Sequence, residues 1–146
     1  MESFGDSRFE CDRDATLAAY SRVIAESAAR CACNGCRNFV LAGTTAFPNQ
    51  FLRLLDSLGV DPLKDGEVYH NARLAPGKHH YGGWFHFVGA LEVRGDFAPV
   101  AFGTDFSAYL CRKQAPCLAE LEGQSLVELH FTASAVPWHL DEPEAT

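Results

Sequence analysis

The sequence has few basic residues and no cluster of positive charge. Of its 146 residues, 12 are lysine or arginine and 19 are aspartate or glutamate, which gives a net charge of −7. Binding to nucleic-acid phosphates or to an anionic membrane surface depends on concentrated positive charge. We therefore expect no nucleic acid and no membrane surface as a partner. The acidic surface favours a protein partner or a basic small ligand.

Long hydrophobic runs are also missing. No apolar stretch approaches the roughly 20 residues that a membrane-spanning helix needs. The first residues, MESFGDSRFECDRD, contain neither the basic region nor the apolar region of a secretory signal. We therefore expect a cytoplasmic protein, whose six cysteines are thiols or metal ligands rather than disulfides.

Common catalytic motifs are absent as well. The chain contains no G-x-G-x-x-G, G-x-S-x-G, Walker loop or H-E-x-x-H. This absence favours a non-enzymatic binding or interaction domain over an enzyme. The length fits a single domain over 1–146, and we expect about 1–10 and 141–146 to be fraying ends.

The spacing of hydrophobic residues changes near residue 66, from a helical to a strand-like pattern. Before it, apolar residues recur at helical spacing over 14–30, where Asp14 is the expected N-cap, and over 34–43 and 48–58. After it, aromatic and β-branched runs predict the strands 67–74, 78–93, 99–103, 106–111 and 126–138. This order predicts an α+β fold, with N-terminal helices packed on a mostly antiparallel sheet formed by the C-terminal half.

The first two predicted strands form a hairpin around the loop 75–77. Its expected register places His70 opposite Gly82, so that His70 and His80 lie on one face and can share a proton, a ligand or a metal. Trp84 then lies on the same face as these histidines, while Tyr81 lies on the other. His79, at the edge of the loop, is expected to face water.

Two glycines in the middle of the second strand leave unusual space. A glycine floor beside aromatic side chains is a candidate ligand pocket. A β-bulge that bends the strand explains the same glycines without a ligand. The candidate ligand-binding residues are His70, His80, Tyr81, Gly82, Gly83 and Trp84.

The segment RCACNGCRNF, residues 30–39, concentrates three cysteines. Cys31 and Cys33 point the same way if their link is extended, and the turn pair Asn34-Gly35 can bring Cys36 back toward them. Three thiolates can hold zinc if a fourth ligand joins them, and the candidates are a histidine or one of the other cysteines, which are Cys11, Cys111 and Cys117.

Two other interpretations of the cysteines remain open. Cys33 and Cys36 form a C-x-x-C at an expected helix N-terminus, where the helix dipole favours a reactive thiolate. A small thiol-dependent enzyme would use this pair, and a histidine-dependent one would use His70 and His80. Alternatively, the cysteines are inert thiols packed at the start of a helix.

Several stretches together resemble a known family. They are CACNGCRNF, FLRLLDSLGVDPLKDGEVY, YGGWFHFVG and PWHLDEP, and they span most of residues 31–142. They are similar to a family of short bacterial proteins with C-x-C-x-x-C-R-N, G-G-W-F-H-F and P-W motifs and no assigned activity. The resemblance implies a bacterial cytosolic protein and carries no mechanism.

Overall fold

The computed structural model describes residues 1–24, 31–92 and 98–146, and helices pack on an antiparallel sheet within these ranges. The α+β class expected from the sequence is therefore confirmed. The strands are β1 (Glu2–Phe4), β2 (Ser7–Cys11), β3 (Glu67–Ala75), β4 (Lys78–Glu92), β5 (Val100–Ala101), β6 (Phe106–Arg112) and β7 (Leu126–Val136). The helices are α1 (Arg13–Ser21), α3 (Asn34–Ala42) and α4 (Asn49–Leu58), with 3-10 turns η1 (Gly43–Ala46) and η2 (Ala119–Leu121).

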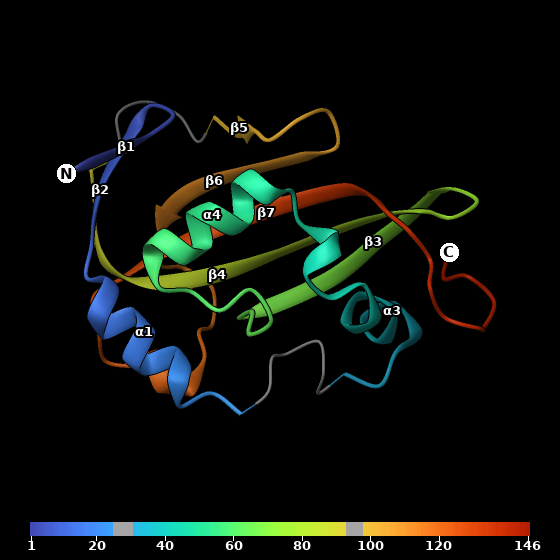
Figure 1. Ribbon diagram of the computed structural model, residues 1–146, viewed down its shortest axis with the longest axis horizontal. Coiled ribbons are helices and arrows are strands. Elements are labelled where there is room, and N and C mark those ends of the chain that lie inside the picture. The colour runs from blue at the N-terminus through green and yellow to red at the C-terminus, as the bar shows by residue number, and fades with distance from the viewer. Residues whose placement is uncertain (25–30, 93–97) are drawn as a thin grey trace.

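The strand β4 is the centre of the sheet. The strand order is β1-β2-β4-β7-β6-β5, and β3 pairs with β4 as well. One edge of β4 pairs with β7, while the other pairs first with β3 and then with β2 (Figure 1). The sheet thus includes two strands from the N-terminus, beyond the C-terminal half expected from the sequence.

The first residues, about 1–10, were expected to fray, but the strands β1 and β2 and the turn between them occupy residues 2–11. Phe9 of β2 is 3% exposed, and Cys11 pairs with Gly89 of β4. The following helix α1 begins two residues earlier than expected. Asp12, and not Asp14, caps it by accepting a hydrogen bond from the Ala15 N–H at 3.0 Å. Helix α1 ends at Ser21. Residues 22–24, which were expected to continue the helix, are described and are not helical, so this part of the prediction is wrong. The remaining residues of the expected helix, 25–30, lie outside the described residues.

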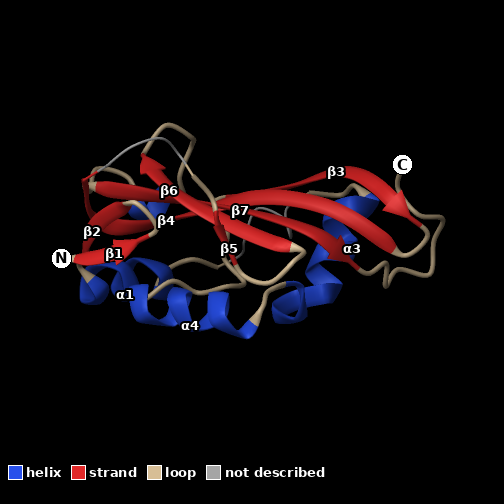
Figure 2. Cartoon of the chain, turned by 90° about the horizontal axis from the view of Figure 1, so that it is seen from above, coloured by secondary structure: helices blue, strands red, loops and turns tan. Residues whose placement is uncertain are grey.

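The helices lie on one side of the sheet, and the core fills the space between them (Figure 2). Alternation along β4 sends Phe85 toward the helices, and Phe51 of α4 meets it there; both are fully buried. Phe106 and Phe131 from β6 and β7 stack beside them, with ring centroids 5.8 Å apart. Burial of each such side chain stabilises the fold by roughly 1.5–3 kcal/mol, so these rings fix how α4 lies on the sheet.

The predicted hairpin is present, but its register is only partly as expected. Ala72 lies opposite His80 as predicted, and a β-bulge between His70 and Ala72 then shifts the pairing by one residue. His70 therefore lies opposite Tyr81, and Gly82 lies opposite Tyr69. The predicted pairing of His70 with Gly82 is wrong, because a bulge changes the register without a clear signal in the sequence.

Two glycines of β4 differ in what a larger side chain would meet. A Cβ atom at Gly89 would lie 1.9 Å from the backbone oxygen of Glu10 in β2, whereas one at Gly82 would lie 2.6 Å from the end of the Tyr69 ring. Tyr69 is 40% exposed and can move aside, but the backbone of β2 cannot move without breaking its pairing with β4.

We predict that Gly89→Ala lowers the free energy of unfolding by at least the roughly 1–3 kcal/mol typical of overpacking. Gly82→Ala is the matched control and should cost less. Urea denaturation of the two variants and the wild type measures both values. Equal losses would contradict the close approach of β2 to β4.

Candidate metal centre

The three cysteines of the segment 31–36 converge at the start of α3. The Sγ atoms of Cys31 and Cys33 lie 3.2 Å apart, and all three Sγ atoms lie within 4.8 Å of one another. Cys31 and Cys33 are exposed, whereas Cys36 is buried. We call these residues the cysteine cluster. Sequence reasoning predicted this convergence, and its alternative of packed, inert thiols fits Cys36 but not the two exposed residues.

Backbone geometry holds Cys33 at the helix terminus. Cys33 is the N-cap of α3, and its Sγ accepts a hydrogen bond from the Cys36 N–H at 3.4 Å. Desolvation works to raise the pKa of Cys33, but the hydrogen bonds from the Cys36 N–H and the Cys31 thiol outweigh it and lower the pKa below its usual value. Burial and hydrogen bonds to Cys33 and Cys31 raise the pKa of Cys36 well above its usual range.

Buried polar groups fix the helix that carries the cluster. The Tyr81 hydroxyl of β4 donates a hydrogen bond to the Gly35 carbonyl at 2.6 Å, and burial raises the pKa of Tyr81 to about 12. Asn38 is fully buried, donates to the Pro137 carbonyl at 3.0 Å and accepts from the His139 N–H at 2.6 Å. The first turns of α3 are therefore bonded both to the sheet and to the C-terminal segment.

The C-terminal residues are held against α3 and β4. Arg37 forms an ion pair with Glu142, in which Nη2 and Oε1 lie 3.1 Å apart, and Trp138 donates to the Glu142 carbonyl at 3.0 Å. Trp138 also packs against the His79 ring with centroids 4.8 Å apart. The tail 141–146, which was expected to fray, thus forms part of the surroundings of the cysteine cluster.

The other cysteines that were candidates for a fourth ligand lie elsewhere. Cys11 donates its thiol hydrogen bond to the Leu58 carbonyl, and Cys111 contacts Glu128. Cys117 is half-buried and packs against the hydrophobic core. Within the described ranges, no fourth histidine, cysteine, aspartate or glutamate groups with the three sulfur atoms. A metal ion here would keep one coordination position open to an external donor.

The histidines of the hairpin form a different arrangement from the expected one. His70 Nε2 lies 2.8 Å from His79 Nδ1, and His79 Nε2 lies 2.9 Å from Glu144 Oε1. Burial and the neighbouring His79 lower the pKa of His70. His80 instead contacts Asn71. The expected site of His70 with His80 is therefore not formed, and His79, expected to face water, is fully buried.

The six candidate pocket residues are divided between the two faces of the sheet. Tyr81 contacts Phe39 on the helix side, and Trp84 contacts His130 on the other side. The space above Gly82 is occupied by the Tyr69 ring, and a Cβ atom at Gly83 would meet Phe131 and a backbone oxygen. These glycines allow close packing within the chain, and the structure does not gather the six residues into one pocket.

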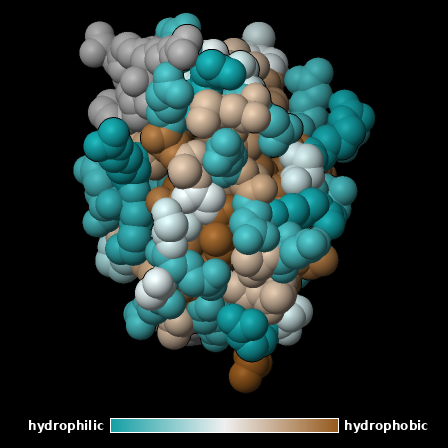
Figure 3. Space-filling model, turned by 90° about the vertical axis from the view of Figure 1, so that its left-hand side faces the viewer, coloured by the Kyte–Doolittle hydropathy of each residue, from teal (hydrophilic) through white to brown (hydrophobic). Residues whose placement is uncertain are grey.

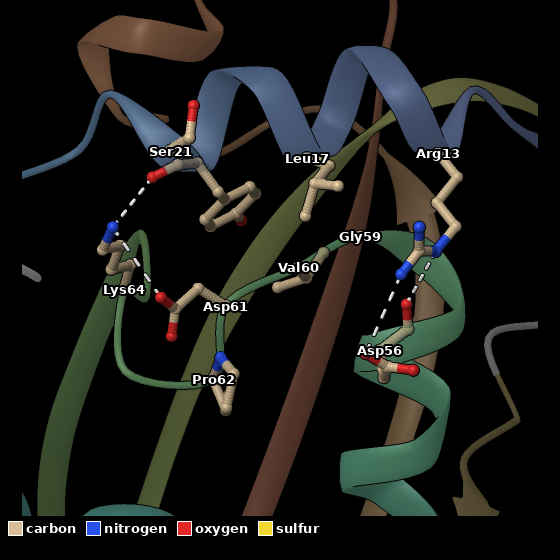
Figure 4. A pocket seen from close by; sticks show the side chains of 10 residues that line it. Arg13, Leu17, Ser21, Asp56, Gly59, Val60, Asp61, Pro62 and Lys64 are labelled. Carbon is tan, nitrogen blue, oxygen red and sulfur yellow. Dashed lines mark hydrogen bonds and ion pairs between the residues drawn. The ribbon is translucent and has the colours of Figure 1, made fainter.

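A separate pocket lies between α1 and the turn after α4. Figure 3 shows that hydrophilic and hydrophobic residues are mixed on the left-hand side of the molecule as drawn in Figure 1. The pocket has a volume of about 280 Å³. Figure 4 shows Lys64 and Arg13 at its two ends, and both cations are engaged by the chain. Lys64 donates to the Tyr20 carbonyl at 2.9 Å, and Arg13 donates to the Asp56 carbonyl at 3.0 Å. The Arg13 contact attaches α1 to α4, and the Lys64 contact attaches α1 to the turn after α4.

The chain was compared with family models, curated proteins and solved structures, and none of them matches it. The resemblance described from the sequence motifs therefore remains a prediction. In the part of the chain that the structure describes, every helix is too short or too polar to span a membrane.

We predict that Tyr81→Phe lowers the free energy of unfolding by roughly 1–3 kcal/mol, because the Gly35 carbonyl loses its buried donor. Tyr69→Phe removes a hydroxyl from an exposed ring and serves as the control. Chemical denaturation measures both variants. A loss in Tyr81→Phe no greater than in the control would contradict the anchoring role of this hydroxyl.

Proposed function

We propose that this protein is a non-enzymatic binding domain in which Cys31, Cys33 and Cys36 hold a zinc ion. The observation that carries this proposal is the convergence of three sulfur atoms within 4.8 Å of one another. Sulfur atoms around a tetrahedral zinc ion, at Zn–S distances of about 2.3 Å, lie about 3.8 Å apart. The cluster therefore needs only small side-chain movements to bind the ion.

The position at a helix N-terminus supports thiolate ligands. The partial positive charge of the terminus stabilises negative charge close to it. Cys33 caps α3 and Cys36 lies in its first turn, so both sulfur atoms lie within that field. The fully bonded Asn38 and Tyr81 hold the helix in place, which limits the entropy lost when the ion binds.

The exposure of the cluster supports a role in binding a partner. Cys31 and Cys33 are open to solvent, so the fourth coordination position of a bound ion would be accessible from outside. Three thiolates around one zinc ion carry a net charge of −1, and the whole chain carries −7. This charge favours a protein or small ligand that brings a neutral donor atom or positive charge to the bound ion.

We predict that protein purified without added metal contains zinc, and that Cys36→Ser contains one equivalent less than the wild type. Elemental analysis measures the content. Because binding of a structural metal stabilises the folded state, chelation should also lower the melting temperature of the wild type. Cys117→Ser is the control and should keep the wild-type content. Equal zinc in the wild type and Cys36→Ser would overturn the proposal.

A second candidate function is thiol–disulfide exchange, favoured by the unequal environments of the C-x-x-C pair. The Cys33 side chain is exposed and its sulfur accepts a hydrogen bond from the Cys36 N–H, whereas the Cys36 side chain is buried. In this reaction the Cys33 thiolate attacks a disulfide of a partner and releases one of its thiols. Cys36 then attacks the mixed disulfide and releases the second thiol, so the partner is reduced and Cys33–Cys36 is oxidised.

We predict that alkylation of the metal-free, reduced protein modifies Cys33 faster than Cys36, and that zinc protects both. Peptide mass analysis after a timed reaction with iodoacetamide gives the two rates. Oxidised glutathione distinguishes the two functions. An exchange protein forms an internal Cys33–Cys36 disulfide, and Cys36→Ser stops at the mixed disulfide. Failure to form the internal disulfide excludes the exchange reaction and leaves the metal site.

A further inference from the structure

A second group of metal-ligating side chains lies on the face of the sheet away from α4. Glu128 and His130 are two residues apart on β7, so both side chains point to the same face. Cys111 of β6 lies directly opposite Glu128. The Cys111 Sγ, one carboxylate oxygen of Glu128 and a ring nitrogen of His130 all lie within 4.8 Å of one another.

The two oxygens of Glu128 have different partners. Oε1 accepts hydrogen bonds from His86 Nε2 at 2.9 Å and from the backbone N–H groups of Gln114 and Ala115 at 3.1 and 2.7 Å. Oε2 accepts from the Cys111 thiol at 3.2 Å and from His130 Nε2. The first oxygen is thus held by groups that position the carboxylate, and the second faces two side chains that are themselves metal ligands.

Glu128 is a buried carboxylate, and no lysine or arginine among the described residues forms an ion pair with it. It is 1% exposed, and its ion-pair partners among the described residues are His86 and His130. Within the described residues, the other ring nitrogen of His86, Nδ1, is buried and has no hydrogen-bond partner. His86 therefore contacts Glu128 through Nε2 alone. Five hydrogen bonds stabilise the Glu128 carboxylate, and a bound cation would add the opposite charge that neutral donors do not supply.

We propose that Cys111, Glu128 and His130 bind a divalent ion of the zinc type. One sulfur, one imidazole nitrogen and one carboxylate oxygen favour zinc over magnesium or calcium. Together with one thiolate and one carboxylate, the ion forms a site of zero net charge, which suits a buried position. His86 and the two backbone N–H groups then act as outer partners that orient the Glu128 ligand.

The fourth coordination position of this ion faces a pocket of about 450 Å³. Tyr109 stacks on the His130 ring with parallel planes and centroids 4.9 Å apart, and Gln114 and Ala115 complete the lining. Three protein ligands with an open fourth position are typical of zinc sites that bind a water or a small ligand. The pocket therefore admits a small molecule with one donor atom for the metal and a flat group that stacks beside Tyr109.

Binding of the metal ion replaces the two hydrogen bonds that Cys111 and His130 donate to Glu128 Oε2. The Cys111 S–H bond breaks, its proton goes to solvent and a sulfur–metal bond forms. A neutral His130 ring keeps its single proton, which moves from Nε2 to Nδ1 as Nε2 binds the ion. Each ion bound to the neutral ring therefore releases one proton, and no group is oxidised or reduced.

We test the site with cobalt(II), a spectroscopic substitute for zinc, in the triple variant Cys31→Ser, Cys33→Ser, Cys36→Ser. This background removes the cysteine cluster, so its metal cannot contribute. We expect one equivalent of cobalt, a thiolate-to-cobalt charge-transfer band and release of about one proton per ion in weakly buffered solution. Zinc should displace the cobalt.

Added variants assign the ligands. Cys111→Ser should abolish the charge-transfer band, and His130→Gln should weaken cobalt binding at least tenfold, while Cys117→Ser, the matched control, should keep both. Circular dichroism shows which variants fold; if Cys111→Ser does not fold, His130→Gln and the proton release decide. No band in the folded triple variant, or a band that persists in folded Cys111→Ser, would overturn the proposal without affecting that for the cysteine cluster.

Discussion

The alternation of side chains along β4 is the constraint on which both candidate sites depend. This strand pairs with β2, β3 and β7, so its residues cannot rotate without breaking three sets of backbone hydrogen bonds. Tyr81 and Phe85 face the helices, and Trp84 and His86 face the other side. One strand therefore separates two chemically different environments: a phenylalanine-rich core beside the cysteine cluster, and a polar group of histidines around Glu128.

The two sites differ in how the fold supports them. The cysteine cluster lies at a helix terminus, where the Cys36 N–H and the helix dipole stabilise the thiolate form of the exposed Cys33. The Glu128 site is buried, and five hydrogen-bond donors compensate its charge. An exposed site can exchange its outer ligand with a partner, whereas a buried one selects a ligand through the shape of its pocket.

Much of the fold follows from local sequence patterns. The change of period near residue 66, the hairpin loop 75–77 and the turn that brings Cys36 toward Cys31 and Cys33 all depend on residues close together in the chain. The strands β1 and β2 were missed because β2 is short and its main partner is more than 75 positions away in β4. No local pattern encodes such a pairing.

The candidate sites show the same division between local and distant contacts. The cysteine cluster was predictable, since all three sulfur atoms belong to six consecutive residues, 31–36, which include the turn pair Asn34-Gly35. The Glu128 site was not, because it joins β4, β6 and β7 with the backbone of the segment after β6. Likewise, because of one bulge His70 contacts His79 instead of His80. The hydrogen bonds continue from His79 to Glu144 near the C-terminus.

The C-terminal segment brings residues that are far apart in the sequence into contact. Asn38, directly after the cysteine cluster, bonds to the backbone at Pro137 and His139, and Arg37 pairs with Glu142. Trp138 stacks on His79 of the hairpin. The C-R-N segment, the start of β4 and the P-W segment thus form one contact region. Its physical consequence is that α3 is fixed on both sides, so two exposed thiols and one buried thiol can hold a defined geometry without a disulfide.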